Sequence, residues 1–260
     1  MPAGLALALM PLLWWEAWRL LAGRLGDGTA ALPLLAVGAA AAWPALRRLS
    51  AGAAPAVPLG FLSALLVPYI LATFAAPPLI VAASAVGGFV LLLRKIAGDG
   101  APLAPLLGLA LLALPVLPSL DFYCAYPMRL VCAEITAMLL RLGGLGVAAD
   151  GVGLRWNGSL LLFDAACSGI RMLWAGALLA SAAALVLRLG FAAYARALAV
   201  AFAAALAANA VRAAGLFYLE NGFVERLRGP VWHEAVGLAC FASAAAATLA
   251  LVVPRRGRAA

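Results

Sequence analysis

The sequence predicts an all-α polytopic membrane protein with about eight transmembrane helices. Of its 260 residues, 67% are hydrophobic and only 11% are charged, whereas a soluble domain is about 45–50% apolar and about 25% charged. Apolar runs of about 20 residues, the length that crosses a bilayer, recur along the chain. Short segments rich in proline, glycine or arginine separate them. This composition excludes a single soluble globule, a disordered chain and a small disulfide-stapled module.

Eight apolar runs are predicted to span the membrane. Pro77-Pro78 marks one turn between them and the segment 102–105 marks another. The sixth and seventh runs are rich in Ala and Gly, which let membrane helices approach closely. The first run lacks the basic beginning and the A-x-A exit of a signal peptide, so we expect it to remain as a span. The predicted spans are 4–22, 29–46, 59–76, 77–94, 102–120, 168–188, 196–218 and 231–253.

Residues 121–166 interrupt this series of spans. Their first half has apolar residues at helical spacing with two arginines and a glutamate between them, which indicates an amphipathic helix at the membrane interface. Their second half contains Asp150-Gly151 and Asn157-Gly158 between short alternating segments, a pattern typical of small β-hairpins. We therefore expect an interfacial helix and a short β-hairpin segment before the sixth span.

The distribution of charge sets the expected orientation. The formal net charge is +8, and membrane proteins collect an excess of Lys and Arg in their cytoplasmic loops. With the N-terminus inside, the short inner loops are consistently basic, as at Arg47-Arg48, Arg94-Lys95 and Arg188. Segment 121–166 is then extracytoplasmic, and the basic excess does not indicate a nucleic-acid binder.

Three polar side chains are expected at one depth near the outer surface. Cys167 begins the sixth span and His233 lies about one turn into the eighth. Arg212 lies about six residues, or roughly 9 Å, inside the outer end of the seventh. An arginine within a span costs at least about 2.5 kcal/mol unless it finds water or a partner, which makes Arg212 a functional candidate.

These residue types suit nucleophilic catalysis by a cysteine. A free thiol has a pKa of about 8.5, and a neighbouring imidazole or helix N-terminus increases its thiolate fraction. Asp164 is placed to cap the sixth helix, with Cys167 in its first turn. His233 would act as a base and then as an acid to a leaving amine. Arg212 would stabilise an oxyanion or hold a substrate carbonyl.

Arg171 is a candidate for a supporting role. It follows Cys167 by one helical turn on the same face. There it would add positive potential, or it would pair with Asp164 or Glu220. The sequence leaves open whether Arg171 takes part in the chemistry or only packs.

Simpler interpretations of the same residues stay open. A cysteine in an apolar helix often only packs, a histidine at a helix end is often an interfacial residue, and the head of Arg212 would reach water if the side chain snorkels. Cys124, Cys132 and Cys240 are interpreted as packing residues, with a Cys124–Cys132 disulfide as an alternative. With one histidine and no CxxC pair, the chain lacks the usual ligands of a zinc site, so we expect no metal and no cofactor.

Three segments resemble the signatures of the exosortase/archaeosortase family of membrane transpeptidases: AACSGIRML, ANAVRAAGL and VWHEAVGL. In that family a Cys within a CSG element, an Arg at the outer end of a following span and a His at the start of the next form the active site. Cys167, Arg212 and His233 match these positions. Ser168 and Asn209, within the first two segments, are further supporting candidates. The resemblance covers about residues 115–250, and the low count of acidic residues favours the bacterial exosortase branch over salt-adapted archaeal proteins.

The resemblance implies a cysteine peptidase or transpeptidase that forms a thioester acyl-enzyme. Its substrates would be secreted proteins with a C-terminal sorting signal, which consists of a short motif, a transmembrane helix and a basic cluster. Other expected partners are membrane lipid and a surface lipid or glycan acceptor, and no nucleic acid is expected. The enzyme would lie in the inner cell membrane with its site on the extracytoplasmic side. Residues 1–120 would form an N-terminal five-helix membrane region and 121–260 the catalytic region.

Two functions of other classes are alternatives to an enzyme. A transport protein would use Arg212 and His233 as part of a polar path, but such a path needs polar groups through the whole membrane depth. The inner halves of the last three spans are almost entirely Ala, Leu and Val, which disfavours transport. A non-enzymatic assembly protein would use the same residues only as interfacial anchors, and replacement of Cys167 by Ser would then be harmless.

Overall fold

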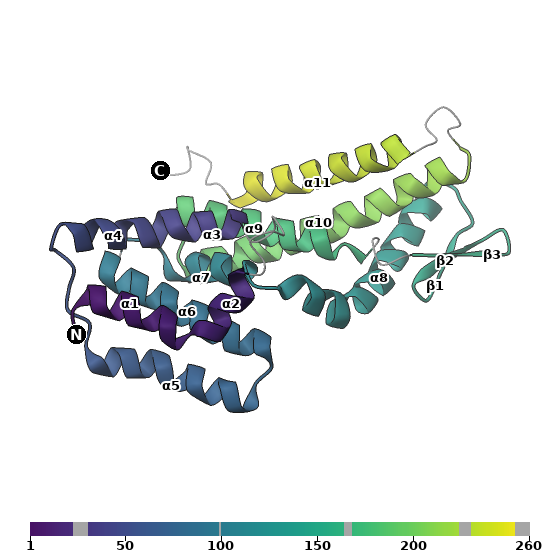
Figure 1. The fold of residues 1–260 in the computed structure, drawn as a ribbon. Helices are drawn as coiled ribbons and strands as arrows, with labels where there is room; N and C mark the ends of the chain where they lie inside the picture. Colours follow the sequence, from purple (N-terminus) through teal and green to yellow (C-terminus); the bar gives the residue numbers. More distant parts are fainter. Residues whose placement is uncertain (23–30, 99, 164–167, 224–229, 253–260) are drawn as a thin grey trace, which may run out of the picture. The chain divides into compact units, whose positions relative to one another are not determined.

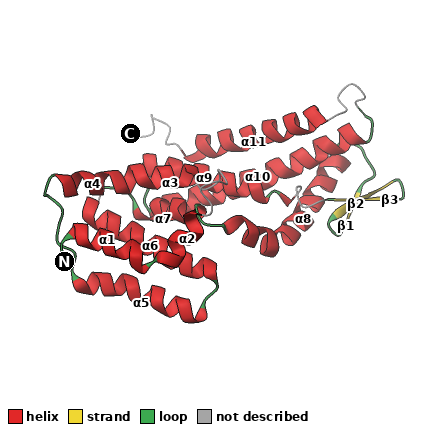
Figure 2. Cartoon of the chain, viewed as in Figure 1, coloured by secondary structure: helices red, strands yellow, loops and turns green. Residues whose placement is uncertain are grey.

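The computed structural model describes residues 1–22, 31–98, 100–163, 168–223 and 230–252. Within these ranges the chain is mostly helical, with one small three-stranded sheet (Figures 1 and 2). The chain divides into two compact units. The first contains residues 1–116 and 184–194, and the second contains 117–183 and 195–260.

Proline residues precede several helices of the first unit. Pro58, Pro77 and Pro102 are the N-cap residues of α5 (Leu59–Ala75), α6 (Pro78–Ala97) and α7 (Leu103–Leu112). The fixed φ of proline suits a helix start, and its missing N–H costs nothing there. The predicted turns at Pro77-Pro78 and Pro102 are therefore confirmed. The helices of this unit are α1 (Ala3–Leu13), α2 (Trp15–Ala22), α3 (Ala31–Val37), the π-helical η2 (Gly38–Ala42), α4 (Trp43–Ser50), α5 (Leu59–Ala75), α6 (Pro78–Ala97) and α7 (Leu103–Leu112).

A buried indole organises the core of the first unit. Trp14 separates α1 from α2 and is 0% exposed. Its ring makes edge contacts with Tyr69 of α5 and Phe89 of α6, with centroid distances of 6.3 and 6.4 Å. A Cβ at Gly88 would lie 3.0 Å from the indole, so the absence of a side chain there makes room for Trp14.

The predicted single helix over 102–120 is wrong. The helix α7 ends at Leu112, and α8 (Val116–Leu142) begins after a break at an angle of 89°. Pro115 lies in the break; it lacks an N–H, and its ring disfavours helical geometry at the preceding residue. The predicted interfacial helix is found within α8, but it starts earlier than residue 121 because Val116 already belongs to it.

A three-stranded antiparallel sheet follows α8 in the order β1-β2-β3. Its strands are β1 (Ala148–Asp150), β2 (Gly153–Trp156) and β3 (Ser159–Leu162). Asn157 and Gly158 connect β2 to β3 with φ of 49° and 80°, the left-handed conformation that a tight hairpin turn requires. The predicted hairpin segment is thus confirmed, although Asp150 is the last residue of β1 rather than part of the first turn.

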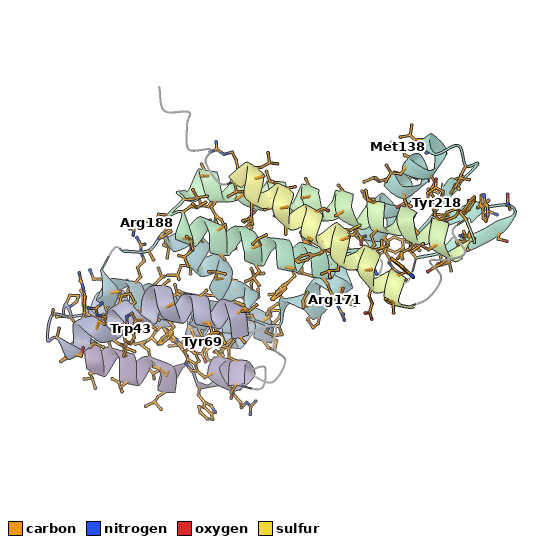
Figure 3. All side chains as sticks on the ribbon, turned by 90° about the horizontal axis from the view of Figure 1, so that it is seen from above. Trp43, Tyr69, Met138, Arg171, Arg188 and Tyr218 are labelled. Atoms are coloured by element: carbon orange, nitrogen blue, oxygen red, sulfur yellow. The ribbon has the colours of Figure 1, made fainter. Side chains whose placement is uncertain are left out.

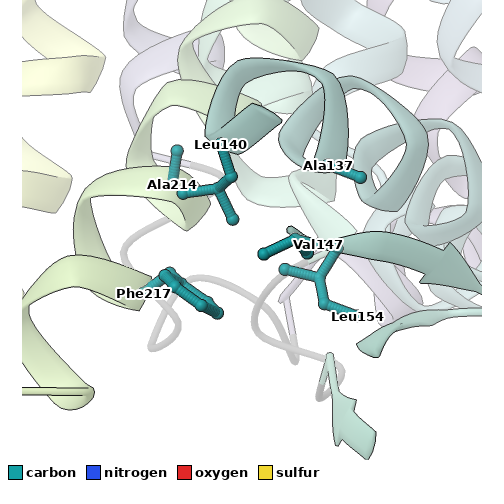
Figure 4. Packing of buried hydrophobic residues seen from close by; sticks show 6 residues of the cluster. All are labelled: Ala137, Leu140, Val147, Leu154, Ala214 and Phe217. Carbon is teal, nitrogen blue, oxygen red and sulfur yellow. The ribbon is translucent and has the colours of Figure 1, made fainter. Parts of the chain in front are cut away.

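The sheet is anchored to two helices by a small apolar core. Leu154 of β2 and Val147, just before β1, pack against α8 and α10 (Phe191–Glu220) in this cluster (Figure 4). Trp156 adds an edge contact with Phe217 of α10, at a centroid distance of 5.2 Å. At the end of α8, a Cβ at Gly143 would overlap the hydroxyl of Tyr218. The sheet is therefore held in place by α8 and α10.

The last three helices are α9 (Ile170–Val186), α10 (Phe191–Glu220) and α11 (Pro230–Val252). Small residues let α9 and α10 approach closely, as the Ala-rich and Gly-rich sequence predicts. Ala180, Ala197 and Ala201 form a buried cluster, and a Cβ at Gly176 would lie 3.5 Å from the carbonyl oxygen of Ala201.

The count of eight spans is not confirmed, although a helix lies in each predicted segment. Among the described residues, three helices are long and apolar enough to cross a membrane: Pro78–Ala97, Phe191–Glu220 and Val231–Val252. The bent pair of α7 and α8 is a fourth if it is one broken span. The helices α1, α5 and α9 are apolar but shorter, in the case of α1 because Trp14 ends the helix.

Candidate active site

Most of the predicted site residues line one cavity of the second unit. The cavity has a volume of about 680 Å³ and lies among α8, the start of α9, α10 and the start of α11. The predicted site residues that line it are Ser168, Arg171, Asn209, Arg212 and His233. Arg171 stands in the first turn of α9 (Figure 3). Cys167 and Asp164 lie outside the described residues, but Ser168 and Gly169 follow Cys167 directly in the chain.

The chain takes a constrained turn into α9. Gly169 has a φ of +77°, which favours glycine. A Cβ at this position would also lie 2.9 Å from Cγ of Asn209. Ser168 is 3% exposed, and its hydroxyl accepts a hydrogen bond from the N–H of Ile170 at 3.4 Å. Both a left-handed backbone and close contact with α10 therefore require the glycine of the CSG element.

Asn209 links this turn to α8. The side chain is 2% exposed, and Nδ2 donates to Sγ of Cys132 at 3.2 Å. One turn further along α8, the hydroxyl of Thr136 donates to the carbonyl oxygen of Ala210 at 3.4 Å. Because buried polar groups are costly unless they are hydrogen-bonded, these contacts hold α8 and α10 in one arrangement beside the cavity.

Arg212 and His233 reach the same cavity because α10 and α11 are in contact beside it. A Cβ at Gly237 would lie 3.3 Å from Nε of Arg212, and one at Gly215 would lie 3.4 Å from Cγ1 of Val236. Gly237 follows His233 by one helical turn, so both lie on one face of α11. The half-buried Arg212 side chain therefore crosses α11 at a position without a side chain, next to the histidine.

His233 also lies beside an acidic residue. Its Nε2 is 4.0 Å from Oε1 of Glu220 at the end of α10. The two side chains are 46% and 68% exposed, so water screens their interaction. The sequence suggested Glu220 as a partner for Arg171, whereas the structure places it next to the imidazole.

Sequence reasoning missed three charged residues of the cavity. Asp121 and Arg129 line it from α8, and Glu234 lines it from α11. Nη1 of Arg129 donates to the carbonyl oxygen of Phe163, at the end of β3, at 3.3 Å. The spacing of Asp121, Ala125 and Arg129 by four residues was the available signal, since it puts all three on one face of a helix. With Arg171 and Arg212, the described residues of the lining include three arginines against two acidic residues.

A second, smaller cavity shares His233 with the first. Its volume is about 300 Å³, and leucine and phenylalanine side chains of the sheet and α10 form most of its wall. Glu220, Asn221 and His233 line it as well. The imidazole thus stands between a basic cavity and an apolar one.

The other cysteines are free thiols. Cys132 is buried against α10, and Cys124 and Cys240 are half-buried. The alternative of a Cys124–Cys132 disulfide is therefore wrong. Among the residues that the structure describes, no group of three or more His, Cys, Asp or Glu side chains is placed to hold a metal ion.

Comparison with known proteins identifies the family. A protein-family model described as transmembrane exosortase matches residues 4–250, which includes the first helices as well as the region that carries the three sequence signatures. No curated protein and no solved structure matches the chain. Because the match extends over nearly the whole sequence, the chain belongs to the transmembrane exosortase family.

Proposed function

We propose that this protein is a membrane-embedded cysteine transpeptidase that cleaves the C-terminal sorting signal of secreted proteins. Membership of the exosortase family supports this activity. The single observation that carries the assignment is that Arg212 and His233 line one cavity with Ser168 and Gly169, the two residues after Cys167. An adjacent thiol, imidazole and guanidinium are the groups that acyl transfer needs.

Each side chain has a defined role in the proposed reaction. His233 takes the proton of the Cys167 thiol, and the sulfur attacks the scissile carbonyl carbon. Arg212 donates hydrogen bonds to the oxygen that becomes negative in the tetrahedral intermediate. Protonated His233 then gives its proton to the leaving amine, the C–N bond breaks, and a thioester to Cys167 remains. An acceptor nucleophile attacks this thioester and releases Cys167.

Substitution of the nucleophile tests the proposal. Candidate substrates are secreted proteins of the source organism that end in a short motif, one apolar helix and a basic cluster. Cys167→Ala is expected to abolish the mass shift that marks their processing, while the protein still inserts and folds. Cys240→Ala is the matched control, because Cys240 is also a thiol of the second unit but does not line the cavity. Normal processing in Cys167→Ala would exclude the assignment.

The proposed orientation has its own test. With the site on the extracytoplasmic side, a membrane-impermeant maleimide added to intact cells should label Cys167. Labelling should be slowed by a peptide with the sequence of the sorting motif. Labelling only after the membrane is opened would place the thiol on the other side.

A further inference from the structure

The apolar cavity beside His233 runs along the edge of a strand. Four consecutive residues of this region line it, Leu160, Leu161, Leu162 and Phe163. Leu154 of β2, opposite Leu161, lines it as well. Successive side chains of a strand point to opposite faces, so a cavity that touches all four residues extends from the face that carries Leu154 and Leu161 to the free edge of β3. In the sheet order β1-β2-β3, this edge of β3 is the one turned away from β2.

The register identifies which backbone groups face this edge. Leu161 is opposite Leu154, Ser159 is opposite Trp156, and the N–H of Phe163 donates to Val152 at 3.0 Å. In an antiparallel pair, hydrogen-bonded and non-bonded positions alternate. The N–H and C=O groups of Leu160 and Leu162 therefore point away from β2. Among the described residues, no backbone partner outside the sheet occupies these two positions.

The opposite wall of the cavity is apolar and ends at the candidate active site. Ala213, Leu216 and Phe217 of α10 contribute side chains to it, and Glu220 and His233 stand at its polar end. An occupant that lies along β3 is therefore bounded by α10 and reaches the imidazole. The same imidazole lines the basic cavity that contains Arg212.

We propose that this cavity binds the substrate as an extended peptide that adds a fourth strand to the sheet at β3. The inference rests on the proposed function. The bound segment is the one N-terminal to the scissile bond, because the membrane helix that follows satisfies its backbone hydrogen bonds internally and cannot pair as a strand. Its backbone pairs with Leu160 and Leu162, and an apolar side chain enters the space between β3 and α10.

The chemistry of the edge favours a peptide over a lipid chain. Exposed strand edges present donors and acceptors at a regular two-residue spacing, which another extended backbone can satisfy. An acyl chain would fill the apolar volume but would leave the N–H and C=O groups of Leu160 and Leu162 without partners, which is unfavourable.

Proline substitution at the edge tests the proposal with a binding measurement. Leu160→Pro and Leu162→Pro each remove one outward N–H and spare the hydrogen bonds between β2 and β3. Ala149→Pro is the matched control, since its N–H faces the other edge of the same sheet by the register of β1 with β2. The probe is a labelled peptide that covers the residues before the membrane helix of a secreted protein whose processing depends on Cys167. Its Kd is measured on Cys167→Ala protein in detergent micelles.

We expect the Kd to rise at least tenfold in Leu160→Pro and Leu162→Pro and less than twofold in Ala149→Pro. N-methylation of the peptide at successive residues should weaken binding at every second position. Because this change is made in the peptide, it does not depend on whether a protein variant folds. Uniform tolerance of N-methylation would overturn the proposal, as would a labelled acyl chain that binds the cavity and displaces the peptide. Loss of processing in Cys167→Ala together with a flat N-methylation scan would reject the strand addition and leave the proposed function intact.

Discussion

The two units of the molecule bury different kinds of side chain. Most of the largest fully buried side chains, including Trp14, Met10 and Leu92, belong to the first unit. Among the described residues, the buried serine, threonine and asparagine side chains all belong to the second unit: Thr136, Ser168, Ser181, Asn209 and Thr248. The first unit is thus stabilised mainly by volume filling, whereas in the second Ser168, Asn209 and Thr136 add buried hydrogen bonds beside the cavity.

Because of this difference, we expect stability and activity to depend on different parts of the chain. Large apolar side chains stabilise the fold by close packing, which does not depend on the direction of individual contacts. Buried polar side chains contribute little net stability but fix direction, since they require partners at defined positions. We therefore expect substitutions in the first unit to lower stability in proportion to lost volume, and substitutions near the cavity to lower activity at nearly constant stability.

The largest expected effect is on the core of the first unit. Trp14→Ala should lower the free energy of unfolding by about 3–5 kcal/mol, because it leaves a cavity between Tyr69 and Phe89. Unfolding in mixed micelles, followed by fluorescence, measures the change. Trp15→Ala is the control, since this neighbouring side chain is 61% exposed, and it should have a much smaller effect. Equal losses in both variants would contradict the view that buried side-chain volume stabilises the first unit.

Arg212→Lys should separate activity from stability in the second unit. We expect processing to fall about 100-fold, because a point charge cannot replace a planar fork of donors. The melting temperature should change little. Arg141→Lys, at the exposed end of α8, serves as the control and should keep full activity. An active Arg212→Lys enzyme would mean that the arginine only anchors α10.

A pair of glycines distinguishes backbone strain from side-chain contact. Gly144 and Gly169 have φ of +84° and +77°, but only at Gly169 would a Cβ meet a neighbour, Asn209. Gly144→Ala should cost about 1 kcal/mol of stability from strain alone. Gly169→Ala should cost more and also reduce processing by at least tenfold, since Asn209 and the turn must move apart. Identical effects on unfolding and processing would show that the contact with Asn209 is unimportant.

The smallest expected effect concerns Glu220. Glu220→Gln should reduce the processing rate only a few-fold, because the interaction with His233 is long and exposed. Glu134→Gln, on the exposed side of α8, is the control. A loss as large as that of Arg212→Lys would show that Glu220 is essential for orienting the imidazole.

Local features of the fold were predictable because they depend on neighbouring residues. Helices lie in every predicted apolar run, and Asn157-Gly158 forms the expected turn because few other residue pairs accept two positive φ angles. The break before α8 was misplaced, since Pro115 and Pro118 are both compatible with ending a helix. The count of eight spans is not confirmed, because hydropathy reports composition and does not detect a helix interrupted at Trp14.

The residues of the candidate site could be predicted from sequence motifs, but the rotation of their helices about the helix axes could not. The sequence placed Arg212 and His233 near one surface, and the structure brings both to one cavity. It could not place Arg129, Asp121 or Glu220, because a helical residue's neighbours depend on which face its helix turns toward the others. For the same reason the sequence offered Asp164 or Glu220 as a partner for Arg171, whereas Glu220 lies beside His233.

The sequence by itself determined the helical class, the hairpin and the order of the three signature segments. Each of these follows from periodicity, turn chemistry or residue identity within a short stretch of chain. The tertiary structure alone decided that Gly237 makes room for Arg212, that Gly169 packs on Asn209, and that the edge of β3 opens onto a cavity ending at His233. Such contacts join residues far apart in the chain, and the packing of whole elements against one another fixes them, which no local pattern encodes.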